Sequence, residues 1–191
     1  NGKINVVKSD FIGNTGHYGS VGRNLGSYID SYFGNNNAVR GGVFDGHGTL
    51  CITGSPFVKN TATERGGAIS ALYNSKFTIS GSSFTENNGG EYGGAISMGA
   101  ASGTSEAAKV TIYNSSFTKN TVSSQGGAIW TDAGSTLSIY NSDFSGNSSK
   151  NGGAIYSYGT VEIANSLFDA NTASVDGGAI YSVGTTNITN S

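Results

Sequence analysis

Apolar and polar residues alternate in short runs along this chain, and the same order of runs returns many times. A typical run places a polar residue between two apolar ones, as in Val110, Thr111 and Ile112. Alternation with a period of two is typical of a β-strand that buries one face and exposes the other. No apolar pattern recurs at helical spacing. The sequence therefore predicts an all-β chain built from many short strands.

A phenylalanine marks each repeat of this pattern. An asparagine follows it three residues later, a serine precedes it by two residues, and from the second repeat on a glycine pair comes eight or nine residues after it. Successive phenylalanines are 22, 24, 27, 33, 27 and 24 residues apart. Repeats of this length are typical of solenoids, in which stacked units bury an apolar face that none could bury alone. The repeats begin at Phe11/Asn14, Phe33/Asn36, Phe57/Asn60, Phe84/Asn87, Phe117/Asn120, Phe144/Asn147 and Phe168/Asn171, and the glycine pairs begin at Gly41, Gly66, Gly93, Gly126, Gly152 and Gly177.

Three short strands and their turns fit into one such repeat, which is the content of one coil of a parallel β-helix. We therefore predict a right-handed parallel β-helix of about seven coils, forming a single domain over residues 1–191 with degenerate first coils at 1–40. The phenylalanines and the isoleucines after the glycine pairs should stack inside. The asparagines should lie at turns, where Asn tolerates a positive φ and its amide can bond to neighbouring coils. Neither end carries an obvious polar cap, so we expect neighbouring coils or domains of a longer chain.

Composition excludes several classes of partner. Charged residues make up 12% of the chain and the net charge is -2, so no basic surface would attract nucleic acid. No apolar run approaches the roughly 20 residues of a membrane-spanning helix, so we expect no direct membrane insertion by this segment. Cys51 is the single cysteine and cannot form an internal disulfide; its strand position should turn it outward.

The glycine pair is part of a longer motif. Gly-Gly-Ala-Ile occurs five times, in phase with Phe-x-x-Asn, and this combination resembles the repeats of chlamydial polymorphic outer-membrane proteins and of adhesin-like β-helix proteins of methanogenic archaea. The resemblance covers about residues 41–191; residues 17–20 and 41–44 depart from the motif. It implies an extracellular or cell-surface adhesin domain, often delivered as an autotransporter passenger. Because its Phe and Ile are expected inside, we interpret the motifs as fold determinants.

Polysaccharide-degrading enzymes also use parallel β-helices, so an enzyme is one alternative. The Asp-Gly-His-Gly of residues 45–48 resembles a polygalacturonase motif. Glycoside hydrolysis requires two carboxylates, however, and the residues level with Asp45 on later coils are Ser70, Ser97, Trp130, Tyr156 and Tyr181. We therefore predict no catalytic residue, and the scattered His, Cys, Asp and Glu predict no metal site and no cofactor. A second alternative, a flat-face ice-binding solenoid, calls for Thr-x-Thr columns that this chain does not repeat.

The outward aromatic residues are the candidate binding site. Trp130, Tyr156 and Tyr181 follow the Gly-Gly-Ala-Ile motif in three successive coils, and Tyr113 and Tyr140 precede the asparagine of an Asn-Ser pair in two coils. We expect both columns to face solvent and to stack on sugar rings or receptor side chains. The competing interpretation is that they only stabilise the stack. The predicted function is a non-catalytic extracellular stalk or adhesin for host or environmental glycans or receptors, with the long loop at residues 99–106 as a second candidate surface.

Overall fold

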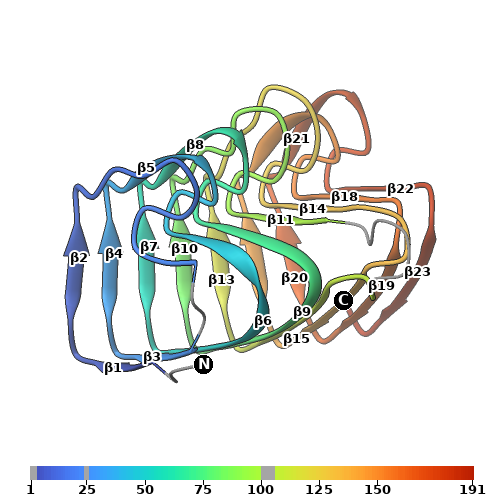
Figure 1. Cartoon of the computed structure of the whole chain (residues 1–191). Coiled ribbons are helices and arrows are strands. Elements are labelled where there is room, and N and C mark those ends of the chain that lie inside the picture. Colours follow the sequence, from blue (N-terminus) through green and yellow to red (C-terminus); the bar gives the residue numbers. More distant parts are fainter. Residues whose placement is uncertain (1–3, 24–25, 100–105) are drawn as a thin grey trace.

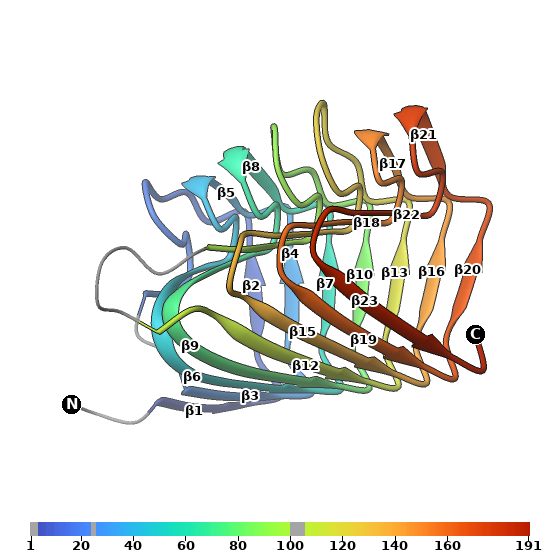
Figure 2. The ribbon, with the colours of Figure 1, turned by 90° about the vertical axis from the view of Figure 1, so that its right-hand side faces the viewer.

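The chain winds into a parallel β-solenoid of about seven coils (Figure 1). The computed structural model describes residues 4–23, 26–99 and 106–191. All strand pairs in this part of the chain are parallel, and each joins one coil to the next. The turned view shows the coils following one another in sequence order along a single axis (Figure 2). The predicted all-β solenoid is confirmed.

Three walls enclose the core. The second wall is the row of upright strands in Figure 1. The first and third walls belong to one 12-stranded sheet, because β6 (Phe44–Thr53) and β9 (Ile69–Ser80) continue from one wall into the other. The first wall contains β1 (Ile4–Val7), β3 (Gly26–Ile29), the later parts of β6 (Phe44–Thr53) and β9 (Ile69–Ser80), β12 (Lys109–Tyr113), β15 (Thr136–Tyr140), β19 (Thr160–Ala164) and β23 (Thr185–Thr189). The second wall contains β2 (Asp10–Ile12), β4 (Tyr32–Gly34), β7 (Pro56–Val58), β10 (Ser83–Thr85), β13 (Ser116–Thr118), β16 (Asp143–Ser145) and β20 (Leu167–Asp169). The third wall contains the first residues of β6 and β9, then β11 (Ile96–Met98), β14 (Ile129–Thr131), β18 (Ile155–Ser157) and β22 (Ile180–Ser182).

Short strands also form between the second and third walls. They pair two by two and lie above the walls in Figure 1. The pairs are β5 (Asn37–Arg40) with β8 (Thr61–Arg65), and β17 (Ser148–Asn151) with β21 (Thr172–Asp176). Each of these strands ends at the residue that directly precedes a glycine pair.

Like side chains stack on one another inside the walls. Phe84 lies in register with Phe57 on one side and with Phe117 on the other. The ring centroids are 4.6 Å and 4.7 Å apart, and the rings are nearly parallel. Phe33, Phe57, Phe84, Phe117 and Phe144 are all fully buried. The predicted phenylalanine ladder is confirmed, and a position within the repeat decides whether a side chain lies inside or outside.

The asparagine ladder differs in one respect from the prediction. Asn87 donates from its side-chain amide to Asn120 Oδ1 (3.0 Å) and to the carbonyl oxygen of Phe57 (3.1 Å), so the predicted bonds between coils are present. The positive φ, however, belongs to the preceding residue, for example Glu86 (φ 55) and Lys119 (φ 53). The asparagine itself must point into the core to reach both neighbouring coils, so the turn is made one residue earlier.

A serine ladder marks the corner between the first and second walls. Ser82 donates from its backbone amide to Ser115 Oγ (3.2 Å), while its own hydroxyl donates to the carbonyl oxygen of Ser80 (2.9 Å). The residue before each serine has a positive φ, which is 56° at Gly81 and 47° at Asn114. Gly and Asn are the residues that adopt this conformation most readily, so the sequence uses one or the other at most of these corners.

The first coils stack in the same register although their motifs are degenerate. Phe11 pairs with Phe33 in the second wall, and bridges join Tyr18 to Arg40 and Gly22 to Phe44. The missing Gly-Gly-Ala-Ile motif therefore does not interrupt the solenoid.

Candidate functional site

Two outward columns face each other across the glycine pairs. We call the residues that follow the buried Ile, or its equivalent, in successive coils the base column. We call the residues that precede the glycine pair, or its equivalent, the rim column. The first glycine of the pair lets them approach: a side chain at Gly93 would collide with the carbonyl oxygen of Ile96, next to the base residue Ser97. The base column is Arg23, Asp45, Ser70, Ser97, Trp130, Tyr156 and Tyr181. The rim column is Tyr18, Arg40, Arg65, Tyr92, Gln125, Asn151 and Asp176.

The expectation that Trp130 and Tyr156 face solvent is wrong. Trp130 is 8% exposed and Tyr156 is 5% exposed, while Tyr181 on the last of these coils is half-buried. The rim column bends over the base column: Trp130 Nε1 donates to Gln125 Oε1 (3.0 Å), and the Tyr92 ring lies 5.2 Å from the Trp130 ring. An outward position in the third wall is therefore covered by the turn that precedes it.

The tyrosines of the base column pack on each other. The rings of Tyr156 and Tyr181 stack at 4.9 Å with planes 16° apart, so one face of each ring is turned toward the ring on the neighbouring coil. Tyr156 also donates its hydroxyl to that of Tyr158 (3.0 Å), and burial together with this bond raises the pKa of Tyr156. This geometry supports packing between coils as one role of the column; whether these residues bind a ligand stays a prediction.

Tyr113 and Tyr140 lie on the outer face of the first wall. Their rings stack at 5.3 Å with planes 18° apart. Tyr113 is 39% exposed and Tyr140 is half-buried. Of the two predicted aromatic columns, this one contains the more accessible rings.

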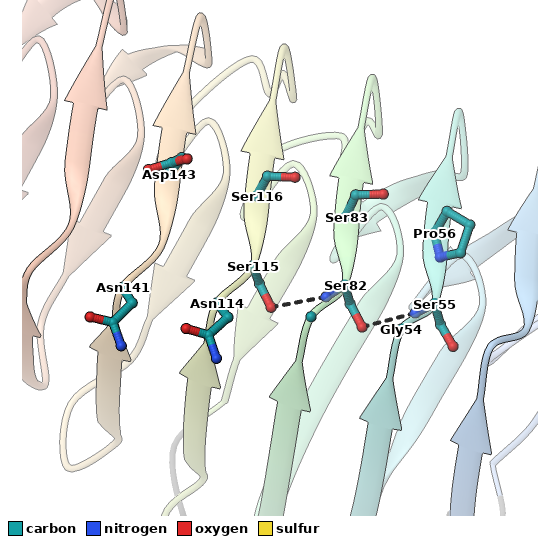
Figure 3. Close-up of a pocket in the computed structure, with 11 residues that line it drawn as sticks. Gly54, Ser55, Pro56, Ser82, Ser83, Asn114, Ser115, Ser116, Asn141 and Asp143 are labelled. Carbon is teal, nitrogen blue, oxygen red and sulfur yellow. Dashed lines mark hydrogen bonds between the residues drawn. The ribbon is translucent and has the colours of Figure 1, made fainter.

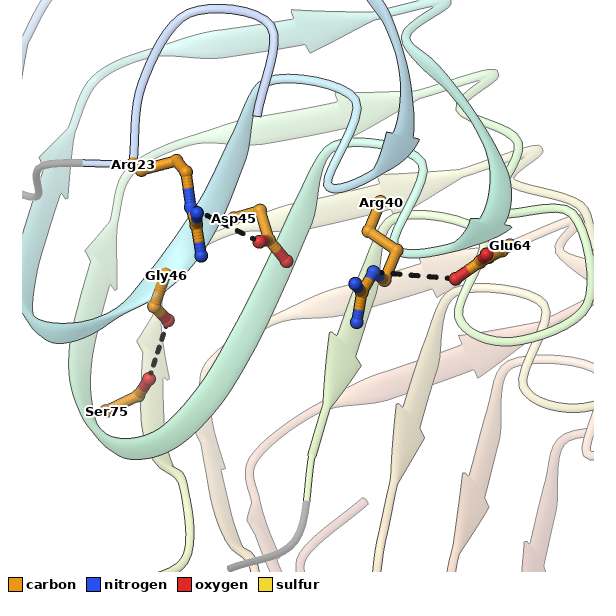
Figure 4. Close-up of polar contacts among 6 residues, drawn as sticks. All are labelled: Arg23, Arg40, Asp45, Gly46, Glu64 and Ser75. Atoms are coloured by element: carbon orange, nitrogen blue, oxygen red, sulfur yellow. Dashed lines mark hydrogen bonds and ion pairs between the residues drawn. The ribbon is translucent and has the colours of Figure 1, made fainter. Parts of the chain in front are cut away.

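The N-terminal part of the base column is charged. Asp45 is 1% exposed and lies 3.8 Å from Arg23 Nε, an ion pair drawn in Figure 4. Its Oδ1 has no hydrogen-bond partner among the described residues. Burial raises the pKa of Asp45, while Ser70 and the nearby arginines act in the opposite direction. Arg23 and Arg40 also pack over the Tyr18 ring, at 5.2 Å and 4.3 Å from its centroid.

No carboxylate is level with Asp45 on the next two coils of the described structure. The strand register places Ser70 and Ser97 level with it on the next two coils, as the sequence predicted. His47 is exposed, and its ring stacks on that of Tyr73 at 5.5 Å. The Asp-Gly-His-Gly segment thus forms part of the bend within β6, where Ser75 Oγ donates to the carbonyl oxygen of Gly46 (Figure 4).

A groove that the sequence did not reveal lies along the serine corner (Figure 3). It has a volume of about 450 Å³, and we call it the corner groove. It crosses four coils at the turn between the first and second walls. The lining residues are Gly54, Ser55, Pro56, Gly81, Ser82, Ser83, Asn114, Ser115, Ser116, Asn141 and Asp143. The signal that could have found it is the run of small residues on both sides of the ladder serines.

Other candidate features add no site. The middle of the long loop, residues 100–105, lies outside the described residues; Glu106 on its far side exchanges hydrogen bonds with Asn74. Within residues 4–23, 26–99 and 106–191, no group of three or more His, Cys, Asp or Glu side chains could hold a metal ion. The same residues include no helix long and apolar enough to cross a membrane.

Comparison with known protein families finds one repeat family that part of the chain resembles. The model of the Chlamydia polymorphic membrane protein repeat matches residues 57–72, 114–132, 141–158 and 165–183. In these four segments, which together make up less than half of the chain, the sequence is similar to polymorphic membrane protein repeats. Each match begins at or just before the second wall, and all but the first begin on the corner residue that precedes a ladder serine. Each then runs through a ladder asparagine and a glycine pair into the third wall.

The matched residues are the structural ones. In the second match, Phe117, Asn120 and Ile129 are fully buried, which agrees with the interpretation of the motifs as fold determinants. No curated protein and no solved structure matches the chain.

Proposed function

We propose that this chain is a non-catalytic, adhesin-like segment of an outer-membrane protein, displayed at the cell surface, and that it attaches the cell to host or environmental glycans or receptors. The observation that carries the proposal is the set of four matches to the polymorphic membrane protein repeat, each in phase with one coil. Delivery as an autotransporter passenger follows from the same resemblance and is part of the proposal.

The distribution of constant and variable positions supports a role in recognition. Ladder positions repeat Phe, Asn and Ser, whereas the base column changes from Asp45 through Ser97 to Trp130 on the same backbone. A solenoid whose interior fixes the fold can vary its outer columns without losing stability, and extended binding surfaces are the usual role of such proteins. Function must still be argued from a site, because the fold alone serves many activities.

Within the predicted aromatic columns, Tyr113 and Tyr140 are the better candidates for direct contact. Tyr113 retains 39% exposure, whereas Trp130 retains 8%. Aromatic side chains that remain partly exposed on a rigid wall can contact a sugar or a receptor with little loss of conformational entropy. We therefore assign first contact to the outer face of the first wall and a supporting role to Trp130, Tyr156 and Tyr181.

Attachment of the chain to cells tests the proposal. Fluorescent beads coated with the chain should adhere to epithelial cells or to a glycan array, and Tyr113→Ala with Tyr140→Ala should lower adhesion severalfold. Tyr73→Ala is a matched control, because Tyr73 is also an exposed tyrosine (36%) but lies at the β9 bend. Absence of adhesion by the unmodified chain would contradict the adhesin role, and release of products from pectins or other uronides would favour the enzymatic alternative.

A further inference from the structure

We propose that the corner groove binds a neutral oligosaccharide, which lies along the solenoid axis with about one sugar on each coil. This inference rests on the proposed attachment function and names the ligand class and the site. It differs from the predicted aromatic columns, because none of Trp130, Tyr156, Tyr181, Tyr113 and Tyr140 lines the groove.

The groove exists because two outward columns carry small residues in successive coils. The corner position before the ladder serine is glycine at Gly54 and Gly81, and the position after that serine is Pro56 or Ser83. At one end, the carboxylate of Asp30 occupies the space that a side chain on Gly54 would need. At the other end the groove is lined by Asn141 and Asp143 (Figure 3). A volume of about 450 Å³ lies within the usual range for sites that bind small ligands.

The floor of the groove is saturated with hydrogen bonds, so an added peptide strand is disfavoured. The backbone amides of Ser55, Ser82 and Ser115 each donate to the hydroxyl of the next ladder serine, at 3.1 to 3.2 Å. Strand addition needs free backbone groups along an edge, and these amides are already used. The ligand must therefore be recognised by the side chains on the two sides of the corner groove.

The side chains on the two sides of the corner groove offer uncharged hydrogen-bond donors and acceptors. The amides of Asn114 and Asn141 and the hydroxyls of Ser83 and Ser116 make no side-chain hydrogen bond to another described residue. Amides and hydroxyls that point toward a concave surface suit a ligand with many hydroxyl groups. Figure 3 shows the two asparagines on one side of the ladder serines and Ser83 and Ser116 on the other.

Charge narrows the ligand class. Among the lining residues Asp143 is the single ionisable group, and the Asp30 carboxylate lies at the opposite end. A uronate, sialate or phosphate group would meet negative charge here without an arginine or lysine to pair with it, so acidic glycans are disfavoured. A neutral sugar meets no such repulsion.

The coil spacing favours a chain of sugars. Equivalent residues on neighbouring coils are about 4.8 Å apart, which is close to the advance of one hexose in an extended oligosaccharide. Asn114 and Asn141 occupy the same position on successive coils, so successive sugars would meet equivalent amides.

The test uses corner substitutions that the fold already accepts. Asn114→Gly and Asn141→Gly together remove both amides and install the residue that the chain carries at Gly54 and Gly81. Gly81→Asn fills the groove instead; its φ of 56° is one that Asn adopts at Asn141, and an added Cβ meets no atom closer than 3.9 Å. Asn165→Gly is the matched control, because Asn165 holds the same corner position (φ 53) outside the groove lining.

Binding is measured by titration calorimetry with oligosaccharides of neutral hexoses and with matched uronides. We expect the neutral series to bind and the uronides to bind more weakly, and we expect about tenfold weaker binding in both the double variant and Gly81→Asn, with no change in Asn165→Gly. Equal affinity in all four proteins, a preference for uronides, or no binding of any neutral oligosaccharide would overturn the groove assignment. If no neutral oligosaccharide binds but the unmodified chain still adheres to cells, the attachment function stands and this site is wrong. If the unmodified chain neither adheres to cells nor binds a neutral oligosaccharide, both proposals are wrong.

Discussion

The two halves of the base column differ in where the larger side chain lies, in the rim column or in the base column. The first coil has large residues at both positions, Arg23 and Tyr18. In the next two coils the base residues Asp45 and Ser70 are short, and the rim residues Arg40 and Arg65 are long. In the C-terminal half the base carries large rings such as Trp130, and the rim is shorter. The backbone of the corner is common to both, because the glycine pairs stack in the same register throughout. After the first coil, the N-terminal half thus places the larger side chain in the rim column, and the C-terminal half places it in the base column.

The energetic consequence differs between the halves. The aromatic half gains from burial of large apolar surfaces and from ring stacking, which stabilise without regard to pH. The charged half buries a carboxylate whose pairing with Arg23 is loose, at 3.8 Å. A buried ion pair contributes little net stability unless its geometry is good. We expect the aromatic half to be the more stable of the two.

Removal of the indole should have the largest effect. Trp130→Ala deletes a ring that is 8% exposed, packs against Tyr92 and donates to Gln125. We expect the free energy of unfolding to fall by about 3 kcal/mol, measured by urea denaturation. A loss below about 0.5 kcal/mol, the usual limit for surface substitutions, would show that the ring faces solvent, as the sequence alone had suggested.

Asp45→Asn should change the pH dependence of stability. Because burial raises the pKa of Asp45, the folded protein holds this proton more tightly than the unfolded chain does. Its contribution is therefore most favourable below the ordinary carboxyl pKa and is lost as the pH rises through the raised value. In Asp45→Asn the loss of stability with rising pH should be smaller. The measurement is thermal unfolding at a series of pH values from about pH 3 upward, across the ordinary carboxyl pKa near 4. A variant that loses stability as the pH rises in the same way as the parent would contradict the assignment to Asp45.

The smallest change is expected at Ser97, which holds the Trp130 position one coil earlier. Its hydroxyl is buried and has no hydrogen-bond partner among the described residues. Ser97→Ala removes this unsatisfied group, so the free energy of unfolding, measured by urea denaturation, should stay the same or rise by less than about 1 kcal/mol. A clear decrease would mean that the hydroxyl has a partner. Together with Trp130→Ala, this variant compares the two halves at one position of the repeat.

The interior of the molecule could be predicted from the sequence because it repeats. Phe84 and Phe117 occur at the same place in the unit, and stacked units must bring like positions together. The pairing of Asp45 with Ser70 on the next coil could be predicted for the same reason. The motifs could be recognised as fold determinants before any coordinate was known.

The surface was harder to predict because it depends on how turns fold back. Alternation places Trp130 outside the third wall, which is correct, but it does not show that the turn through Gln125 covers the ring. The corner groove was missed for a different reason. It arises from absent side chains at Gly54 and Gly81, and a glycine in a sequence gives no sign of whether the space beside it stays open.

The in-register stack is the central claim, and the single native cysteine allows a direct test. Cys51 is exposed and lies level with Thr78 on the next coil, and Thr78 lies level with Thr111 one coil further. Neighbouring coils are about 4.8 Å apart, within the range of Cα distances that a disulfide spans, whereas two coils exceed it. We predict that Thr78→Cys forms an intramolecular disulfide with Cys51 under mild oxidation, detected by mass spectrometry, and that Thr111→Cys does not. A reduced Thr78→Cys protein, or equally fast oxidation of Thr111→Cys, would contradict the solenoid register.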